Sequence, residues 1–320
     1  MPSDLAVVLV GACMILLLRG VKESAAINAV LVVLKLLVLL FFVVVAFSGF
    51  HAGNLKPFMP MGVAGVGAAA SSIFFSDIGI DAVSTAGEEV KDPRRTLPLG
   101  IVLSLLIVTA VYILVALAAV GAQPWTAFKG QEAGLAVILR NLTGQAWTSL
   151  ILCVGAIVSI FSITLVVMYG QTRILFTMAR DGLLPASFAK VHPTFHTPST
   201  GTIVTGVLAA LIGGLFPVGI LGEMVSIGTL AAFVTVCIGV LVLRRTRPDL
   251  ERPFKTPAPW FTCIVGAIVC FTMMVNLGLG TWIRLVVWTI IGAIIYALYG
   301  YKNSRLHRAN GETAPVSATR

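Results

Sequence analysis

Long apolar runs alternate with short polar connections along the whole chain, and this alternation is the strongest structural signal in the sequence. Nine runs are candidates for membrane-spanning helices, which need about 20 apolar residues each. They cover residues 5–18, 24–49, 63–87, 99–121, 148–170, 202–220, 224–243, 260–280 and 284–300. The pattern predicts an all-α, polytopic membrane protein with about nine transmembrane helices.

Proline positions support these runs. Only Pro217 among the 15 prolines lies inside a run, close to its end, as expected because proline is excluded from helix interiors. In the connection before residue 99, Thr96 and Pro98 are candidate first residues of the next helix. The connection 122–147 contains a short apolar stretch, AGLAVILRNL, that predicts a short helix at the membrane interface.

Composition agrees with a membrane protein. The 320 residues are 58% hydrophobic and 11% charged, whereas soluble domains carry about 25% charged residues. The runs leave no room for a folded soluble domain, so residues 1–301 are expected to form a single transmembrane domain. Residues 302–320 are polar and predict a disordered tail. All five cysteines lie inside the runs, and we interpret them as small buried residues rather than as disulfides or metal ligands.

Lys and Arg are distributed unequally between the two sets of connections. One set carries four: Lys56, Lys129, Arg140 and Arg284. The other carries 17: Arg19, Lys22, Lys91, Arg94, Arg95, Arg173, Arg180, Lys190, Arg244, Arg245, Arg247, Arg252, Lys255, Lys302, Arg305, Arg308 and Arg320. Cytoplasmic loops accumulate cations, so the second set, and with it the C-terminus, is predicted to be cytoplasmic. The formal charge of +9 therefore reflects topology and contact with membrane lipid, and it does not indicate a nucleic-acid partner.

Lys35 lies in the middle of the 24–49 run, with apolar residues on both sides. Ionisable groups in a membrane are costly and are usually kept for function. One interpretation is that the side chain extends to the membrane surface. The other is a buried ammonium group that faces the helix bundle, takes the place of a bound cation and exchanges a proton.

The 63–87 run is interrupted by the segment Phe74–Asp81, in which two carboxylates and a glycine occur. Transporter sites near the membrane midplane are built from broken helices of this kind. Gly79 would permit the break. Asp81 would either cap the second half-helix or contact a ligand. Asp77 would either face a water-filled vestibule or contribute charge to a ligand site.

Three segments resemble amino acid permeases of the amino acid-polyamine-organocation superfamily, specifically the cationic amino acid transporter branch. They are FFSDIGIDAVSTAGEEVKDPRRTLPLGI, RGVKESAAINAVLVVLK and YGQTRILFTMARDGLLP. The first resembles the family's sixth helix, the second its fourth-to-fifth helix junction, and the third the cytoplasmic end of its eighth helix. The resemblance covers residues 5 to about 301 and corresponds to family helices four to twelve. It implies an inverted-repeat, LeuT-type transporter fold that lacks the first three helices, and we expect that the chain is N-terminally truncated.

The resemblance also implies roles for individual residues. Sixth-helix positions around the amino acid substrate correspond to Phe75, Ser76, Ile78 and Gly79, whose carbonyls would receive its amino group. Eighth-helix positions that line the side-chain pocket correspond to Ser159, Ile160 and Thr164. Lys35 corresponds to a lysine that, in the family, is linked to the coupling of transport to protons. The first-helix break, which binds the substrate carboxylate in the family, is not in this sequence.

Two positions depart from the family pattern, and one group of charges suggests a gate. Asp77 replaces an aromatic residue and Ile80 replaces phenylalanine. The carboxylate of Asp77 would favour a cationic substrate, or it marks a sequence that has lost function. Glu88, Glu89 and Arg173 at helix ends would either form a gate ion pair or remain solvated.

The sequence offers little support for an enzyme. The chain has no HExxH, P-loop or GxSxG motif, and its four histidines lie outside the runs. A membrane enzyme, a bound metal and a cofactor are therefore not expected. A non-transporting fragment with a structural or regulatory role stays open. The favoured function is secondary active uptake of cationic or small neutral amino acids, coupled to protons, in the plasma or inner membrane.

The unequal distribution of cations predicts which connections share a side of the membrane. Single cysteines at positions 94, 190 and 252, on a background without native cysteines, should react with a membrane-impermeant thiol reagent only from the cytoplasmic side. Cysteines at positions 56 and 129 should react only from outside. Labelling of positions 56 and 94 from the same side would contradict the assignment of spans.

Overall fold

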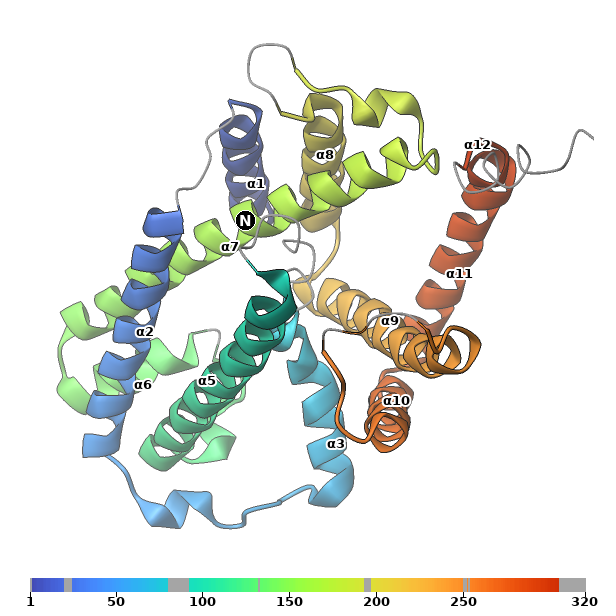
Figure 1. Cartoon of the computed structure of the whole chain (residues 1–320). Helices are drawn as coiled ribbons and strands as arrows, with labels where there is room; N and C mark the ends of the chain where they lie inside the picture. The colour runs from blue at the N-terminus through green and yellow to red at the C-terminus, as the bar shows by residue number, and fades with distance from the viewer. Residues whose placement is uncertain are drawn as a thin grey trace, which may run out of the picture.

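The computed structural model describes residues 2–19, 25–79, 92–131, 133–192, 197–249, 252 and 254–304, and these contain helices and connections but no β-strand. Figure 1 shows the arrangement. The α-helices are α1 (Pro2–Leu18), α2 (Ala25–Ser48), α3 (Gly62–Ile73), α5 (Pro93–Ala122), α6 (Gly134–Thr143), α7 (Ala146–Arg180), α8 (Ser199–Leu215), α9 (Val218–Thr246), α10 (Pro259–Val275), α11 (Leu279–Ile295) and α12 (Tyr301–Asn303).

Five of the described helices are long and apolar enough to cross a membrane: α2, α5, α7, α9, and α11 with its π-helical continuation to Gly300. Helices α1, α8 and α10 have 17 residues each, which corresponds to about 25 Å. Helix α3 has 12 residues. The prediction of an all-α, polytopic membrane protein is confirmed.

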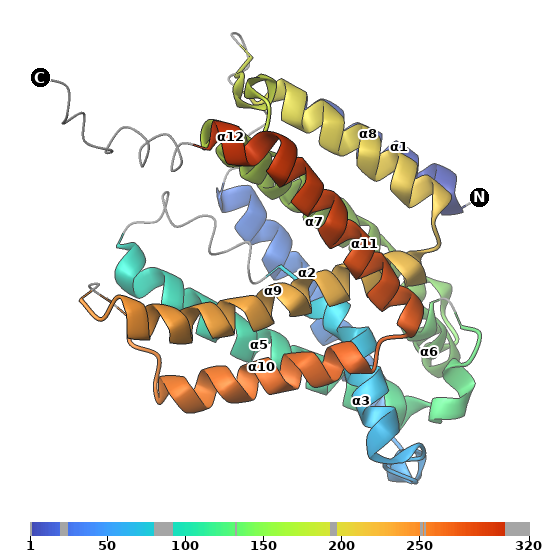
Figure 2. The same cartoon turned by 90° about the vertical axis from the view of Figure 1, so that its right-hand side faces the viewer.

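The helices pack in three groups (Figures 1 and 2). Helix α2 contacts α5, α6 and α7; α1 packs on α8 and α7; and α9 packs on α10 and α11. In Figure 2 the α9–α10 connection and the start of α5 lie at one end of the bundle, on the left. The Thr197 hydroxyl donates to the Leu18 carbonyl at 3.4 Å and so ties the α7–α8 connection to the end of α1.

Close helix packing depends on glycine at the contact points. A Cβ atom at Gly155 of α7 would lie 2.8 Å from Cγ1 of Val38 in α2. At Gly206 of α8 it would lie 2.5 Å from the sulfur of Met14 in α1. Small residues let helix backbones approach in a membrane, where the hydrophobic effect does not drive helix association.

Several predicted helix boundaries were wrong. Helix α5 begins at Pro93 and contains Pro98, so neither Thr96 nor Pro98 is its first residue. Proline suits the first helical position, and an internal proline is tolerated when neighbouring groups cover the backbone. The break between α8 and α9 falls at Phe216 and Pro217 rather than after residue 220. Proline holds the preceding residue extended, so α8 ends at Leu215.

The short helix predicted in the connection 122–147 is present as α6, but it packs against protein. Ile138 and Leu139 are 1% and 0% exposed and join a cluster with Phe42 of α2 and Ala118 of α5. This face of α6 is therefore covered by α2 and α5, and its position at the membrane interface stays a prediction. Most of the predicted tail, residues 305–320, lies outside the described residues, whereas Lys302 and Asn303 belong to α12.

The contact between α2 and α7 predicts opposite effects for the same substitution at two glycines of α7. Gly155→Ala should lower the free energy of unfolding by about 1–3 kcal/mol, because its methyl group overlaps Val38. Gly170→Ala meets no atom within 4 Å, so it should be neutral or stabilise the helix by up to about 1 kcal/mol. Thermal unfolding of both variants in detergent measures the difference, and equal melting temperatures would contradict this packing.

Candidate functional site

The predicted interruption of the 63–87 run is present. Helix α3 stops at Ile73, and a 3₁₀ turn covers Phe74–Asp77. Ile78 then has extended backbone angles, with φ −70° and ψ 132°, and Gly79 has φ +130°. This positive φ suits glycine, which has no side chain. Ile80 and Asp81 lie outside the described residues, so the capping role of Asp81 stays a prediction.

Aromatic side chains hold the interrupted segment against α9. The ring of Phe74 stacks edge to face on Phe233, with 6.1 Å between centroids. It also packs beside the buried residues Ile227 and Leu230. The Phe75 ring, 47% exposed, lies 3.8 Å from the position that a Cβ atom would take on Gly222. The segment is therefore fixed on one side and exposed on the other.

Tyr112 of α5 supplies a polar partner for the irregular backbone. Its hydroxyl donates to the Ser76 carbonyl at 2.9 Å. The Phe75 carbonyl accepts a long bond of 3.4 Å from the Ile78 N–H. A carbonyl has two lone pairs, so both oxygens keep the capacity to accept a donor from a ligand. Asp77 is half-buried beside the Tyr112 phenol, within electrostatic range.

Lys35 lies on the face of α2 that is turned into the bundle. It is half-buried and shares this face with Val38 and with Phe42 and Ala46, both 0% exposed. Residues at these spacings lie above one another on a helix. The opposite face is exposed, with Val44 at 65%. This position favours a bundle-facing lysine over one that extends along a lipid-facing surface.

The structure brings Lys35 to the level of Ser159. Helices α2 and α7 run in opposite directions and touch where Val38 meets Gly155, so Lys35, one turn before Val38, faces the turn after Gly155. Ser159 occupies that turn, and its hydroxyl donates to the Gly155 carbonyl at 2.7 Å.

The interrupted segment lies near the same level of the bundle. Helices α2 and α5 run in the same direction and contact each other where Phe42 packs with Ala118. Lys35 lies seven residues before Phe42, and Tyr112 lies six residues before Ala118. Lys35 and the contact between Tyr112 and Ser76 therefore both lie about two helical turns from this point.

The other predicted α7 residues are not on the surface that Ser159 shares with Gly155. Ile160 and Thr164 lie one helical turn apart, and Ile160 is 53% exposed. The Thr164 hydroxyl donates to the Ile160 carbonyl at 2.7 Å, a bond within its own helix. The predicted pocket face is therefore divided between two sides of α7.

The predicted gate is described on one side only. The Arg173 guanidinium lies over the Tyr169 ring, 5.1 Å from its centroid. Glu88 and Glu89 lie outside the described residues, so a gate ion pair stays a prediction. In the described ranges, no group of three or more His, Cys, Asp or Glu side chains is arranged to hold a metal ion.

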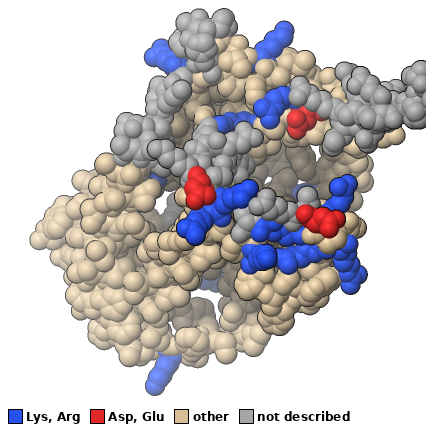
Figure 3. Space-filling model, in the orientation of Figure 1, with Lys and Arg blue, Asp and Glu red and all other residues tan. Residues whose placement is uncertain are grey.

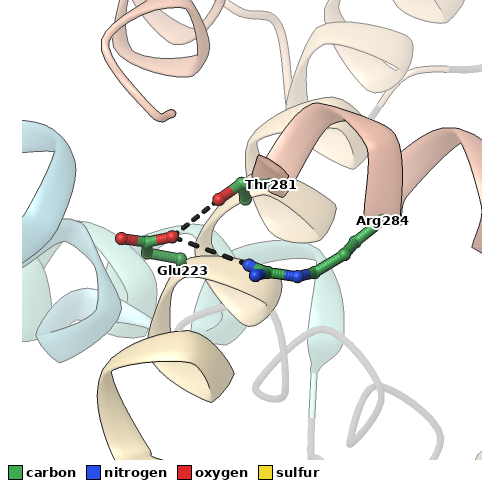
Figure 4. A network of polar contacts seen from close by, with 3 residues as sticks. All are labelled: Glu223, Thr281 and Arg284. Carbon is green, nitrogen blue, oxygen red and sulfur yellow. Dashed lines mark hydrogen bonds and ion pairs between the residues drawn. The ribbon is translucent and has the colours of Figure 1, made fainter. Parts of the chain in front are cut away.

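A polar network between α9 and α11 was not found by sequence reasoning (Figure 4). The Thr281 hydroxyl donates to Glu223 Oε2 at 2.6 Å, and the Arg284 guanidinium lies 3.9 Å from the same oxygen. Arg284 was predicted to lie in a connection, whereas it lies inside α11, and Glu223 lies inside α9. The sequence signal for this network was a single charged residue near the start of each of two apolar helices. Gly222, which packs on Phe75, precedes Glu223 directly.

Together, the apolar helices, the interrupted helix and the bundle-facing lysine define a polytopic membrane protein with the architecture of a transporter. Residues 5–301 match the model of the family described as amino acid permease. The chain belongs to the amino acid permease family.

Three relatives illustrate the range of that family. The chain is 43% identical to the branched-chain amino acid permease BcaP of Bacillus subtilis, in an alignment that covers 95% of this chain and 65% of the permease. It is 40% identical to the methylthioribose transporter of the same organism, with 91% of this chain and 62% of the transporter aligned. It is 39% identical to cationic amino acid transporter 4, vacuolar, of Arabidopsis thaliana, with 73% of this chain and 40% of the transporter aligned. The chain thus spans less than two thirds of the length of these relatives.

The bond from Tyr112 predicts a stability effect at the interruption. Tyr112→Phe keeps the ring but removes the donor to the Ser76 carbonyl, and should lower the free energy of unfolding by about 0.5–1.5 kcal/mol. Tyr296→Phe, at a position 52% exposed, is the matched control and should leave the melting temperature unchanged. Identical melting curves for the two variants would show that the bond does not stabilise the interruption.

Proposed function

We propose that this chain forms the larger part of an amino acid transporter, with the substrate held at the interruption after α3. The single observation that carries the proposal is the irregular backbone at Phe74–Gly79 in the middle of an apolar run. Non-helical backbone at membrane depth is tolerated where it is covered by protein or lines a water-filled cavity. Midplane transporter sites use such backbone to bind polar groups.

The proposed substrate contact is an ammonium group that donates to the carbonyls of Phe75, Ser76, Ile78 and Gly79. The exposed side of this segment leaves room for it, since the Phe75 side chain is 47% exposed and Ser76 is exposed. Family membership supports an amino acid as the substrate. The group that binds the substrate carboxylate is expected in the part of the longer relatives that this chain does not span.

Lys35 is the proposed site of proton coupling. Its bundle-facing position brings an ammonium group near the level of the interruption and opposite Ser159. The charge of Lys35 would depend on access to water from either side of the membrane, which suits coupling of a proton gradient to uptake.

Asp77 is the proposed determinant of substrate charge. Its carboxylate lies half-buried in the interrupted segment, where it would attract a cationic side chain and disfavour an anionic one. The relatives carry names for branched-chain and for cationic substrates, and we propose that Asp77 shifts this chain toward the cationic class. The proposed location is the plasma or inner membrane, with the cation-rich end and the C-terminus in the cytoplasm.

Uptake into proteoliposomes tests the proposal. The protein would be the chain extended by the N-terminal third of the Bacillus subtilis branched-chain permease, with labelled arginine, leucine and alanine as substrates. An imposed inward proton gradient should drive saturable accumulation of arginine above that of alanine. Lys35→Ala should reduce gradient-driven accumulation about tenfold or more, since positioned proton-transfer groups typically contribute at least that much. Equilibrium binding of the amino acid should persist.

The matched control for Lys35→Ala is Lys129→Ala, which removes a cation from a connection and should leave uptake unchanged. Gradient-driven uptake by Lys35→Ala at the unsubstituted level would exclude Lys35 from coupling. Absence of saturable uptake for all three amino acids in the extended protein would contradict transport at this site.

A further inference from the structure

The connection between α9 and α10 carries more cations than any other connection between helices. Residues 244–255 contain five cations and two acids, which gives a formal charge of +3. Figure 3 shows Lys and Arg side chains gathered on this part of the molecule, right of the centre. The described connections at the opposite end hold only isolated cations, such as Lys56 and Lys129.

One cation shapes the connection. The Arg252 guanidinium donates to the carbonyls of Arg247 at 2.7 Å, Pro248 at 2.9 Å and Leu243 at 3.4 Å. The last carbonyls of a helix have no partner within the helix. Arg252 supplies donors to this end of α9 and folds the connection back toward it.

Other cations of the segment face outward. Arg245, Arg247 and Lys255 are exposed, and Arg244 is partly exposed. Asp249 is an exposed acid in the described part of the connection. The outward surface therefore has an excess of positive charge. This charge comes from the exposed cations and not from Arg252, whose guanidinium binds backbone carbonyls.

Aromatic and aliphatic side chains lie directly beside these cations. The Arg245 guanidinium lies over the Trp260 ring, 4.6 Å from its centroid. Trp260 is 42% exposed, Phe261 71% and Val242 53%. Tryptophan is enriched at the level of lipid headgroups. The surface thus changes from cationic to apolar within one helical turn, on both α9 and α10.

We propose that the exposed cations Arg245, Arg247 and Lys255, with the apolar side chains beside them, form a binding site for an anionic phospholipid. The phosphate group binds to the cationic surface, and the acyl chains lie along the exposed faces of Val242 and Phe261. A soluble anion would contact only the cations. A phospholipid matches both the cationic and the apolar part of this surface, and each surface cation adds favourably to binding of an anionic headgroup.

Native mass spectrometry of the 320-residue chain tests the site without reference to transport. The chain in detergent is titrated with phosphatidylglycerol or phosphatidylcholine of identical acyl chains. Phosphatidylglycerol should be retained preferentially. The triple variant Arg245→Gln, Arg247→Gln and Lys255→Gln should lose this preference, with a decrease in affinity of roughly fivefold for each cation removed.

Two control variants distinguish lipid binding at this site from a general effect of positive charge. The triple variant Lys56→Gln, Lys129→Gln and Arg140→Gln should retain phosphatidylglycerol like the unsubstituted chain. Replacement of Arg245 and Arg247 by Lys keeps the charges and should also retain it, which distinguishes lost binding from misfolding. Equal retention of the two lipids, or equal losses in both Gln triple variants, would overturn the proposal.

Trp260 gives a second measurement. Brominated phosphatidylglycerol should quench tryptophan fluorescence more than brominated phosphatidylcholine, and Trp260→Phe should remove the difference. Displacement of the lipid by millimolar inorganic phosphate would show that the site recognises a free anion, and would also overturn the proposal.

Discussion

Backbone polar groups inside a membrane must find partners, and the rest of this structure depends on how the interruption after α3 meets that requirement. A continuous helix satisfies its own N–H and C=O groups, whereas the segment Phe74–Gly79 does not. The Tyr112 hydroxyl and the Ile78 N–H each cover one carbonyl. The aromatic contacts of Phe74 and Phe75 with α9 hold the segment in place. The irregular backbone is thereby held against α5 and α9 on one side, and its exposed side is available to a ligand.

The second organising feature is the close contact of α2 with α7. Glycine at position 155 lets the two helices approach at Val38, and this contact sets the register that puts Lys35 opposite Ser159. The contact of Phe42 with Ala118 sets the register of α2 against α5. Because α5 carries Tyr112, the two registers together place the lysine and the interruption near one level. Helix packing thus positions both parts of the proposed site.

Much of the fold was predictable because apolar runs mark helices directly. The interruption was predictable for a related reason, since Asp77, Gly79 and Asp81 stand out in an apolar run. Helix ends were less predictable, because apolar residues continue past them. Pro98 lies inside a helix although the sequence suggested a start there, and local sequence does not show which neighbours cover the backbone.

Contacts between distant segments were not predictable. Glu223 and Thr281 are 58 residues apart, and nothing in either local pattern indicates the other. The separation of Ser159 from Ile160 and Thr164 likewise follows from which face of α7 meets α2. The Tyr112 hydroxyl, inside an apolar run, gave no sequence signal of its bond to Ser76.

Hydrogen–deuterium exchange at residues 74–79 tests directly whether the interruption after α3 is a substrate site. The protein would be the chain extended with the N-terminal third of a bacterial relative, with and without a saturating amino acid. We expect faster exchange for amides of residues 74–79 than for the middle of α5, and slower exchange when the amino acid is added. Exchange as slow as in α5, with no response to any amino acid, would contradict a substrate site at this interruption.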